Sequence, residues 1–321
     1  MDAERFQSDL EAKPAALREL AGVLRDGLVD QVDLTGVRRL VCVGMGSSRF
    51  AALPVVAWLR AAGIDAVAEY ASLERGHPGG ADTLVAGVSA SGSTPETVAA
   101  LAGRDPASRR LAVTNGGGEL ATVADHHLDV HAGVEAGGVA CRSFQHTLAV
   151  LLALATRLRG DGPDVASACE RAAEATEDLL ERQDRWLPPL SELLREAPTA
   201  FLLAPAERRS SAEQGALMLR EGPRRPADAC ETGDWLHVDV YLSKPLDYRC
   251  VLFAGSRFDA GVFDWLEQRN GRCAVVGADQ PRAAQTIRYR GEDDPVVALL
   301  TEVLVAELLA ARWWREQLPE R

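Results

Sequence analysis

Hydroxyl side chains and a glycine occur together at the point where a buried strand ends and a helix begins. The strand is the apolar run Leu84 to Val88, and Pro95 suits the first turn of the helix. The residues between them include Ser89, Ser91, Gly92, Ser93 and Thr94. Main-chain N–H groups, the positive end of the helix dipole and these hydroxyl groups would face an anion such as phosphate. An ordinary serine-rich turn with a helix cap explains the same segment, so both interpretations stay open at this point.

A second turn of similar composition follows an earlier strand. Gly44-Met45-Gly46-Ser47-Ser48 comes after Leu40 to Val43 and precedes an apolar-periodic helix. Gly-x-Gly after a strand also occurs in dinucleotide sites, but Arg49 stands where the third glycine of that fingerprint belongs. Ligands of parallel sheets lie beyond the carboxyl ends of the strands. Two such turns in neighbouring βα units therefore predict one shared phosphate pocket, with Gly46, Ser47 and Ser48 as further binding residues.

These segments, taken together, resemble the SIS (sugar isomerase) family. That phosphosugar-binding fold occurs in the isomerase half of glucosamine-6-phosphate synthase and in fructosamine-phosphate deglycases. The resemblance includes Ala112-Val113-Thr114-Asn115, Leu120-Ala121 with Ala124-Asp125, and Glu135 through Phe144, and it covers most of the chain. It implies an α/β fold with two SIS-type subdomains, each a doubly wound, flavodoxin-like α/β/α sandwich around a parallel sheet.

The resemblance also implies two catalytic residues in the second half of the chain. In the family, a glutamate ends a small-residue helix and a histidine follows sixteen positions later; here Glu221 and His237 keep that spacing. Aldose–ketose interconversion needs a base that moves a proton between C1 and C2, and an acid or base that opens the ring at O5. Glu221 matches the first role and His237 the second. The family often assembles its site across a dimer, with the histidine lent by the neighbouring subunit.

The same two residues have simpler interpretations when only the local sequence is considered. Glu221 is followed by Gly222-Pro223, a helix stop, and fits a solvated acid at a helix end. His237 lies among Trp235, Leu236 and Val238, where a partly buried, hydrogen-bonded histidine is the commoner outcome. Their preserved spacing favours the catalytic interpretation.

Departures from the family narrow the expected mechanism. Amidotransferase-linked members use one lysine near the C-terminus as a Schiff base and another in the helix before the glutamate, whereas this chain has only Lys13 and Lys244. Met218 occupies the helix position, and Met1 is followed by Asp2 rather than by the cysteine of a glutaminase. We therefore expect neither imine catalysis nor glutamine hydrolysis. Arg142 stands where the family usually has a lysine before Phe144, so a planar guanidinium replaces the compact charge of an ammonium group. Arg142 is predicted to contact the sugar.

Alternating strands and helices organise the rest of the chain. Further strands are expected at Arg110–Thr114, His127–Val130, Ala200–Leu203, Cys250–Ala254 and Arg272–Val276, with a buried helix over Phe144–Leu158. An acidic helix over Asp164–Arg182 and a break at Trp186-Leu187-Pro188-Pro189 follow. We expect an N-terminal SIS domain with a leading helix at 1–160, a helical connector at 161–197 and a C-terminal SIS domain at 198–321.

Composition excludes several classes of function. A net charge of −12 at pH 7 argues against nucleic acid as a partner. The six cysteines have no CxxC spacing, which predicts neither a metal site nor a disulfide framework. No apolar run is long enough to cross a membrane and no signal-peptide pattern is present, so a cytoplasmic protein is expected. No cofactor is predicted.

Two hypotheses about function remain. The first is a phosphosugar enzyme, either an aldose–ketose isomerase or a fructosamine-6-phosphate deglycase. The second is a non-catalytic sugar-phosphate sensor or regulatory subunit, suggested by the missing lysines and the altered segment around Arg142. A homodimer is expected from the family and from a long apolar helix over Val296 to Trp314, although the chain's own core more often covers such a stripe.

Overall fold

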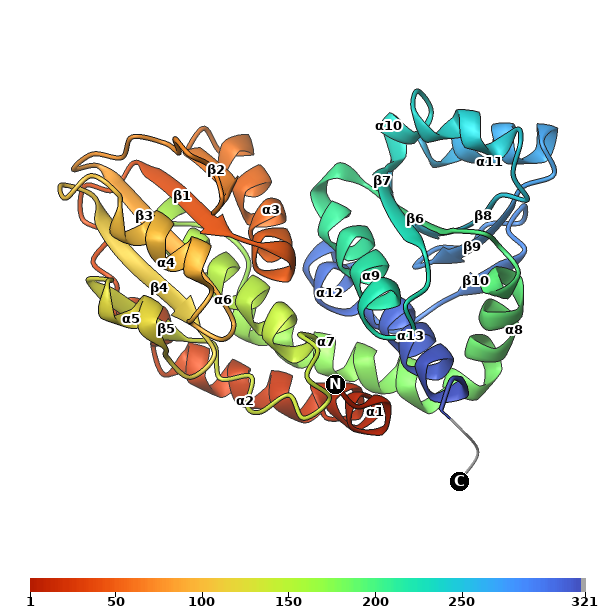
Figure 1. The fold of residues 1–321 in the computed structure, drawn as a ribbon, viewed down its shortest axis with the longest axis horizontal. Coiled ribbons are helices and arrows are strands. Elements are labelled where there is room, and N and C mark those ends of the chain that lie inside the picture. Colours follow the sequence, from red (N-terminus) through yellow and green to blue (C-terminus); the bar gives the residue numbers. More distant parts are fainter. Residues whose placement is uncertain (319–321) are drawn as a thin grey trace. The chain divides into compact units, whose positions relative to one another are not determined.

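The computed structural model describes residues 1–318, which form two compact units that interleave along the chain (Figure 1). The first-sheet unit comprises Ala15–Glu135 and Ala140–Glu170. The second-sheet unit comprises Met1–Pro14, Ala136–Val139 and the chain from Arg171 onward. The short segment 136–139 belongs to the second-sheet unit, although residues of the first-sheet unit flank it on both sides.

The first-sheet unit contains a five-stranded parallel sheet of order β2-β1-β3-β4-β5. Its strands are β1 (Arg39–Gly44), β2 (Asp65–Tyr70), β3 (Thr83–Val88), β4 (Arg109–Thr114) and β5 (His126–Asp129). Its helical segments are the 3-10 turn η1 (Leu28–Gln31), α3 (Gly46–Ala61), α4 (Pro95–Ala102), α5 (Glu119–Thr122) and α6 (Arg142–Arg159). Helices α2 (Lys13–Arg25) and α7 (Val165–Glu181) begin in one unit and end in the other.

The second-sheet unit repeats this topology. Its strands, β6 (Ala200–Ala204), β7 (Ala227–Glu231), β8 (Arg249–Phe253), β9 (Arg272–Val276) and β10 (Gln285–Ile287), are parallel in the order β10-β9-β8-β6-β7. Its helices are α1 (Ala3–Glu11), α8 (Gln183–Arg195), α9 (Arg209–Glu221), α10 (Thr232–Trp235), α11 (Asp259–Gln268), α12 (Pro295–Thr301) and α13 (Leu304–Glu316). Two 3-10 turns are η2 (Ala206–Arg208) and η3 (Asp239–Ser243). Read from β7 to β10, the order matches that from β2 to β5, so the predicted pair of doubly wound subdomains is confirmed.

Burial explains why the central strands could be predicted. Every residue of β3 is buried, and so are all residues of β6 and β8, because helices cover both faces of a parallel sheet. The predicted buried helix over Phe144–Leu158 is confirmed as α6, most of whose side chains are buried. Cys42 of β1 and Cys250 of β8 are 1% and 0% exposed.

The break predicted at Trp186-Leu187-Pro188-Pro189 is wrong. Helix α8 begins at Gln183 and continues through both prolines to Arg195, so the boundary between helices lies earlier, at Arg182. Each proline removes one main-chain donor from the helix. Burial of one face of α8 and a 3.0 Å hydrogen bond from the Trp186 indole to the Leu179 carbonyl hold this segment in place.

The single long helix predicted over Val296 to Trp314 is also wrong. The chain forms α12 and α13, interrupted at Glu302 and Val303, and the buried Glu302 carboxylate accepts a 2.9 Å hydrogen bond from Arg208. The apolar stripe is covered within its own unit, where α13 packs against α1, α8 and α9. The stripe therefore gives no support to the expected dimer.

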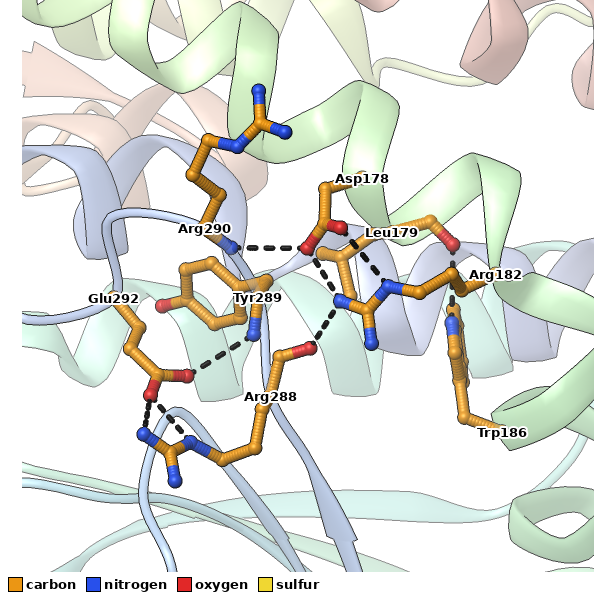
Figure 2. A network of polar contacts seen from close by, with 8 residues as sticks. All are labelled: Asp178, Leu179, Arg182, Trp186, Arg288, Tyr289, Arg290 and Glu292. Atoms are coloured by element: carbon orange, nitrogen blue, oxygen red, sulfur yellow. Dashed lines mark hydrogen bonds and ion pairs between the residues drawn. The ribbon is translucent and has the colours of Figure 1, made fainter.

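A polar network holds the segment after β10 against α7 (Figure 2). Asp178 accepts a hydrogen bond from the main-chain N–H of Arg290 at 3.0 Å and pairs with Arg182, one turn further along the chain. Arg182 in turn donates to the Arg288 carbonyl at 2.6 Å. Glu292 accepts from the Tyr289 N–H and pairs with the Arg288 side chain. These contacts connect α7 to the last strand of the second sheet.

Lys13 and Glu307 form a fully buried ion pair between α2 and α13. Replacing Glu307 by Leu would leave the Lys13 ammonium in the interior without this carboxylate. We expect the free energy of unfolding to fall by about 3–5 kcal/mol, measured by urea denaturation. The double variant Lys13→Met/Glu307→Leu removes both charges and should recover most of the loss; equal instability of the single and double variants would contradict this account.

In the described residues, 1–318, no helix combines the length and apolarity that crossing a membrane requires.

Candidate active site

The two serine-bearing turns lie at the same edge of the first sheet. Strands β1 and β3 are adjacent and parallel, so the residues that follow Gly44 and Val88 emerge side by side at the carboxyl edge. A Cβ atom on Gly44 would lie 3.1 Å from the Val88 carbonyl oxygen, which shows how closely the two strand ends approach. The predicted juxtaposition of residues 45–48 and 89–94 is thus present in the structure.

The loop over residues 89–94 is organised by its own hydroxyl groups. The Ser89 and Thr94 hydroxyls share a 2.9 Å hydrogen bond, and the Ser91 hydroxyl accepts the Ser93 N–H at 3.2 Å. Ser89 is buried, whereas Ser91 and Ser93 are exposed. The hydroxyls that face solvent are therefore those of Ser91 and Ser93, while Ser89 and Thr94 hold the loop in shape.

Helices α3 and α4 both begin at this edge without a side-chain cap. Met45 and Thr94 occupy the N-cap positions, and neither side chain bonds a main-chain N–H of the first turn. The first N–H groups of a helix lack partners within the helix. These free N–H groups can surround an anion together with Ser47 and Ser48. Both serines are half-buried in the first turn of α3. We call residues 45–48 and 89–94 the cradle.

A third loop, which the sequence analysis missed, supports the cradle. Gly92 has φ +64°, and a Cβ atom there would lie 1.7 Å from the carbonyl oxygen of Gly117. The Gly92 carbonyl accepts the Leu120 N–H at 2.8 Å, and the Ala90 carbonyl accepts the Asn115 N–H at 2.9 Å. Three consecutive glycines at 116–118, all with positive φ, were the available sequence signal.

Two cavities lie in the first-sheet unit, and no residue of the cradle lines either of them. One of about 460 Å³ lies between the segment 71–78 after β2 and helix α4. Another, of about 500 Å³, lies beyond β4 and β5 and is lined by Asn115, Asp129, His131, Val134 and Glu135 among others. Either volume is within the range of small-molecule sites.

Arg142 lies at the start of α6, near the larger cavity. Its guanidinium donates a hydrogen bond to the carbonyl of Val134, which is 85% exposed. Glu135 accepts the main-chain N–H groups of Cys141 and Arg142 at 2.7 and 2.6 Å, so a carboxylate already occupies the N-terminus of α6. Arg142 thereby fixes the wall of this cavity, and its contact with a sugar stays a prediction.

Glu221 is the last residue of α9, as its family position predicts. Partial burial raises the pKa of the Glu221 carboxyl above its usual range, and the nearby charges of Arg220 and Arg224 oppose the shift. A raised pKa suits a carboxylate that takes and returns a proton near neutral pH.

His237 is exposed and follows α10, whereas Glu221 precedes β7. Helix α9 leaves the carboxyl end of β6 and returns to the amino edge of the sheet, where the carbonyl of Pro226 accepts the Ala200 N–H at 3.1 Å. Strand β7 then crosses the sheet, roughly 13 Å at about 3.3 Å per residue, before His237 is reached. The two residues therefore lie at opposite edges of the second sheet.

The equivalent turn in the second sheet has different chemistry. After β6, Arg208 donates to Glu302 at 2.9 Å and also to the Ala254 carbonyl, which follows β8. The Gly255 N–H donates to the Asp259 carboxylate at 2.8 Å. The chain's own charged groups thus occupy this strand-end position in the second sheet.

In the described part of the chain, the histidines and cysteines form no further metal or catalytic site. His127 shares a 2.8 Å hydrogen bond with Thr114, and the fully buried His146 bonds the Val130 carbonyl. All six cysteines are buried thiols. Over residues 1–318, no cluster of three His, Cys, Asp or Glu side chains is arranged to hold a metal ion.

Comparisons with known proteins agree with this architecture. Residues 33–157 match the model of the SIS domain. Over 304 residues the chain is 27% identical to glutamine–fructose-6-phosphate aminotransferase (isomerizing) of Gloeobacter violaceus, covering 84% of this chain and 49% of that protein. The chain thus spans about half the length of this curated relative. The match covers 40% of the corresponding protein of Thermococcus kodakarensis.

Solved structures share the fold over almost the whole chain. The C-terminal domain of glucosamine-fructose-6-phosphate aminotransferase from Francisella tularensis has a TM-score of 0.80 at 16% identity, over 97% of this chain and 96% of that chain. Tagatose-6-phosphate ketose/aldose isomerase from Escherichia coli has a TM-score of 0.78 at 18% identity, over 97% and 92%. The predicted resemblance to the SIS family is confirmed over residues 33–157.

Proposed function

We propose that the chain is a phosphosugar enzyme that transfers a proton on a sugar phosphate or amino-sugar phosphate. It would act as an aldose–ketose isomerase or as a fructosamine-6-phosphate deglycase. The observation that carries this proposal is the meeting of two hydroxyl-bearing turns at adjacent strand ends, where two helices begin uncapped. The residues proposed to bind phosphate and sugar are Gly46, Ser47, Ser48, Ser89, Ser91, Gly92, Ser93, Thr94 and Arg142.

Glu221 is proposed as the base. In an isomerase, it would move one proton between C1 and C2 of the open-chain sugar. In a deglycase, it would take a proton from C1 of a fructosamine 6-phosphate to give an enamine; return of the proton at C2 leaves an imine that water hydrolyses, releasing the amine. His237 would open the ring at O5.

A homodimer is part of this proposal. Because Glu221 and His237 lie at opposite edges of one sheet, joint action on one substrate requires His237 from a second copy. The site would then be shared across the interface.

The lysines support a mechanism without a covalent imine to the protein. The Lys13 ammonium is fully buried in its ion pair with Glu307, and Lys244 is an exposed residue after η3. An amine that forms a Schiff base must be reachable by the substrate carbonyl. Lys13 is fully buried and does not meet this condition.

The test is proton exchange observed by NMR. The protein would be incubated in D₂O with fructose 6-phosphate, glucosamine 6-phosphate or a fructosamine 6-phosphate. We expect loss of the C1 or C2 proton signal, and release of free amine from the last substrate if the chain is a deglycase. Binding without exchange for all three would instead support the sugar-phosphate sensor, and failure to bind any of them would refute both functions.

The pH dependence of turnover should report the environment of Glu221. A base acts when deprotonated, and burial raises the pKa of Glu221, so kcat/KM should rise with pH through a limb above the range of an ordinary glutamate. Arg220 and Arg224 lower that pKa, so Arg220→Gln/Arg224→Gln should move the limb to higher pH. A limb that stays in place in this variant would contradict Glu221 as the titrating base.

A further inference from the structure

Arg49 lies in the first turn of α3, directly after Ser47 and Ser48 of the cradle. Its guanidinium carbon lies 4.0 Å from the centre of the Tyr70 ring, and the side chain is half-buried. A guanidinium over an aromatic ring is held by a cation–π contact while the N–H groups at its edge stay able to donate. In the sequence alone, Arg49 stands out only as a departure from the dinucleotide-binding fingerprint.

The position of Tyr70 locates the guanidinium at the edge of the sheet that carries the cradle. Tyr70 ends β2 and stands opposite Gly44, the last residue of β1. The next residue, Ala71, donates its N–H to the Gly44 carbonyl at 3.2 Å. Arg49 and its aromatic support therefore border the first turn of the cradle.

Arg49 has no carboxylate partner anywhere in residues 1–318, where no hydrogen bond or ion pair joins its side chain to another group. Its Nε is completely shielded from solvent and makes no hydrogen bond. Arg104 of the same unit provides the contrast, because its buried guanidinium donates to Glu69 at 2.9 Å and to the His77 carbonyl at 2.7 Å. Partly desolvated charges are normally paired, and this chain has 47 acidic residues available for pairing.

We infer that Arg49 supplies the positive charge of the cradle and makes it selective for phosphorylated ligands over neutral sugars. The inference rests on the proposed function. It adds a charged donor, and the neutral hydroxyl and main-chain donors cannot fill its role. Neutral donors of the cradle can bind a sugar hydroxyl as well as a phosphate oxygen. A guanidinium gains a charge-assisted, bidentate contact only with the anion.

The experiment measures dissociation constants for fructose 6-phosphate, inorganic phosphate and fructose by calorimetry. Arg49→Gln is compared with Arg60→Gln, which removes the same charge from an exposed position in the last turn of the same helix. We expect Arg49→Gln to weaken fructose 6-phosphate binding about ten- to a hundredfold, and Arg60→Gln to change it less than about twofold. The affinity of the wild type should also fall more steeply with salt than that of Arg49→Gln.

Tyr70 provides a second, independent arm. Tyr70→Phe keeps the ring and should bind fructose 6-phosphate as the wild type does. Tyr70→Leu loses the stacking contact and should weaken binding by about two- to tenfold. Arg49→Lys keeps the charge but not the planar fork and should fall between the wild type and Arg49→Gln. Thermal melts of each variant establish that it is folded.

The outcomes separate this inference from the proposed function. If the wild type and Arg49→Gln bind fructose 6-phosphate equally well, the role of Arg49 is overturned. The proposed function stands in that case. If inorganic phosphate binds in an Arg49-dependent way but no sugar phosphate binds, Arg49 is supported as an anion ligand. The proposed function is then refuted. No binding of either anion by the wild type would overturn both.

Discussion

Replacing Glu221 by Gln is expected to abolish proton exchange at C1 and C2 while leaving sugar-phosphate binding within about twofold of the wild type. The amide matches the carboxyl in shape, so the end of α9 should be preserved, but it cannot accept a proton. General-base catalysis contributes typically about 10²- to 10⁴-fold, and turnover should fall by that factor. Full activity in Glu221→Gln would remove this residue from its proposed role.

Mixing two inactive variants tests whether His237 comes from a second copy. Glu221→Gln and His237→Asn, dissociated and reassociated at equal concentrations, should regain up to about a quarter of wild-type activity. Half of the randomly formed dimers then contain both kinds of chain, and one of their two sites has both intact residues. A mixture as inactive as its components would contradict a site completed across an interface. Light scattering of the wild type gives the oligomeric state directly.

Gly92→Ala is expected to eliminate detectable phosphate binding. Gly92 has φ +64°, and an added Cβ would lie 1.7 Å from the Gly117 carbonyl oxygen, so either the cradle or the glycine loop beside it must move. Strain at a left-handed position adds a destabilisation of about 1–3 kcal/mol. Calorimetric titration with fructose 6-phosphate and a thermal melt measure the two effects.

Gly116→Ala is the matched control for Gly92→Ala. Gly116 also has a positive φ, +95°, but nothing lies within 4 Å of the Cβ that would be added. This variant should lose stability through backbone strain and keep its affinity for fructose 6-phosphate. Equal loss of binding in both variants would mean that the loop after β4 contributes more than support, and unchanged binding in Gly92→Ala would refute the cradle as the phosphate site.

The predicted position of the cradle followed from the way parallel sheets are built. Once Leu40–Val43 and Leu84–Val88 are recognised as neighbouring parallel strands, the residues after them must emerge at one edge. Those strands are apolar throughout because both faces are covered. No assumption about side-chain contacts was needed for that step.

Edge strands were harder to find, and three were missed. β2 (Asp65–Tyr70), β7 (Ala227–Glu231) and β10 (Gln285–Ile287) each border their sheet, and several of their side chains are half-buried or exposed. Their sequences therefore lack the apolar run that identified the central strands. Without β2, the sequence could not place Tyr70 beside Arg49.

Contacts distant in sequence explain the remaining differences. The prolines of α8 lie inside a helix because its buried face outweighs two lost main-chain donors, and that burial is not visible locally. The interruption at Glu302 accompanies an ion pair with Arg208, about ninety positions earlier. Gly92 and Gly117 meet only because their loops follow adjacent strands β3 and β4. In each case, the deciding partner lies far along the chain.

The interleaving of the two units has a practical result for anyone who wishes to produce one lobe alone. Phe6 lies 5.9 Å from Trp314, ring centre to ring centre, and the Asp9 carboxylate accepts the Gly137 N–H at 2.7 Å, so both ends of the polypeptide and a tetrapeptide from its middle build the same core. Cutting the chain at any one position therefore cannot release either unit intact. A fragment ending near residue 160 would leave the apolar face of α1 without the helix that covers it, and such a fragment should aggregate upon expression.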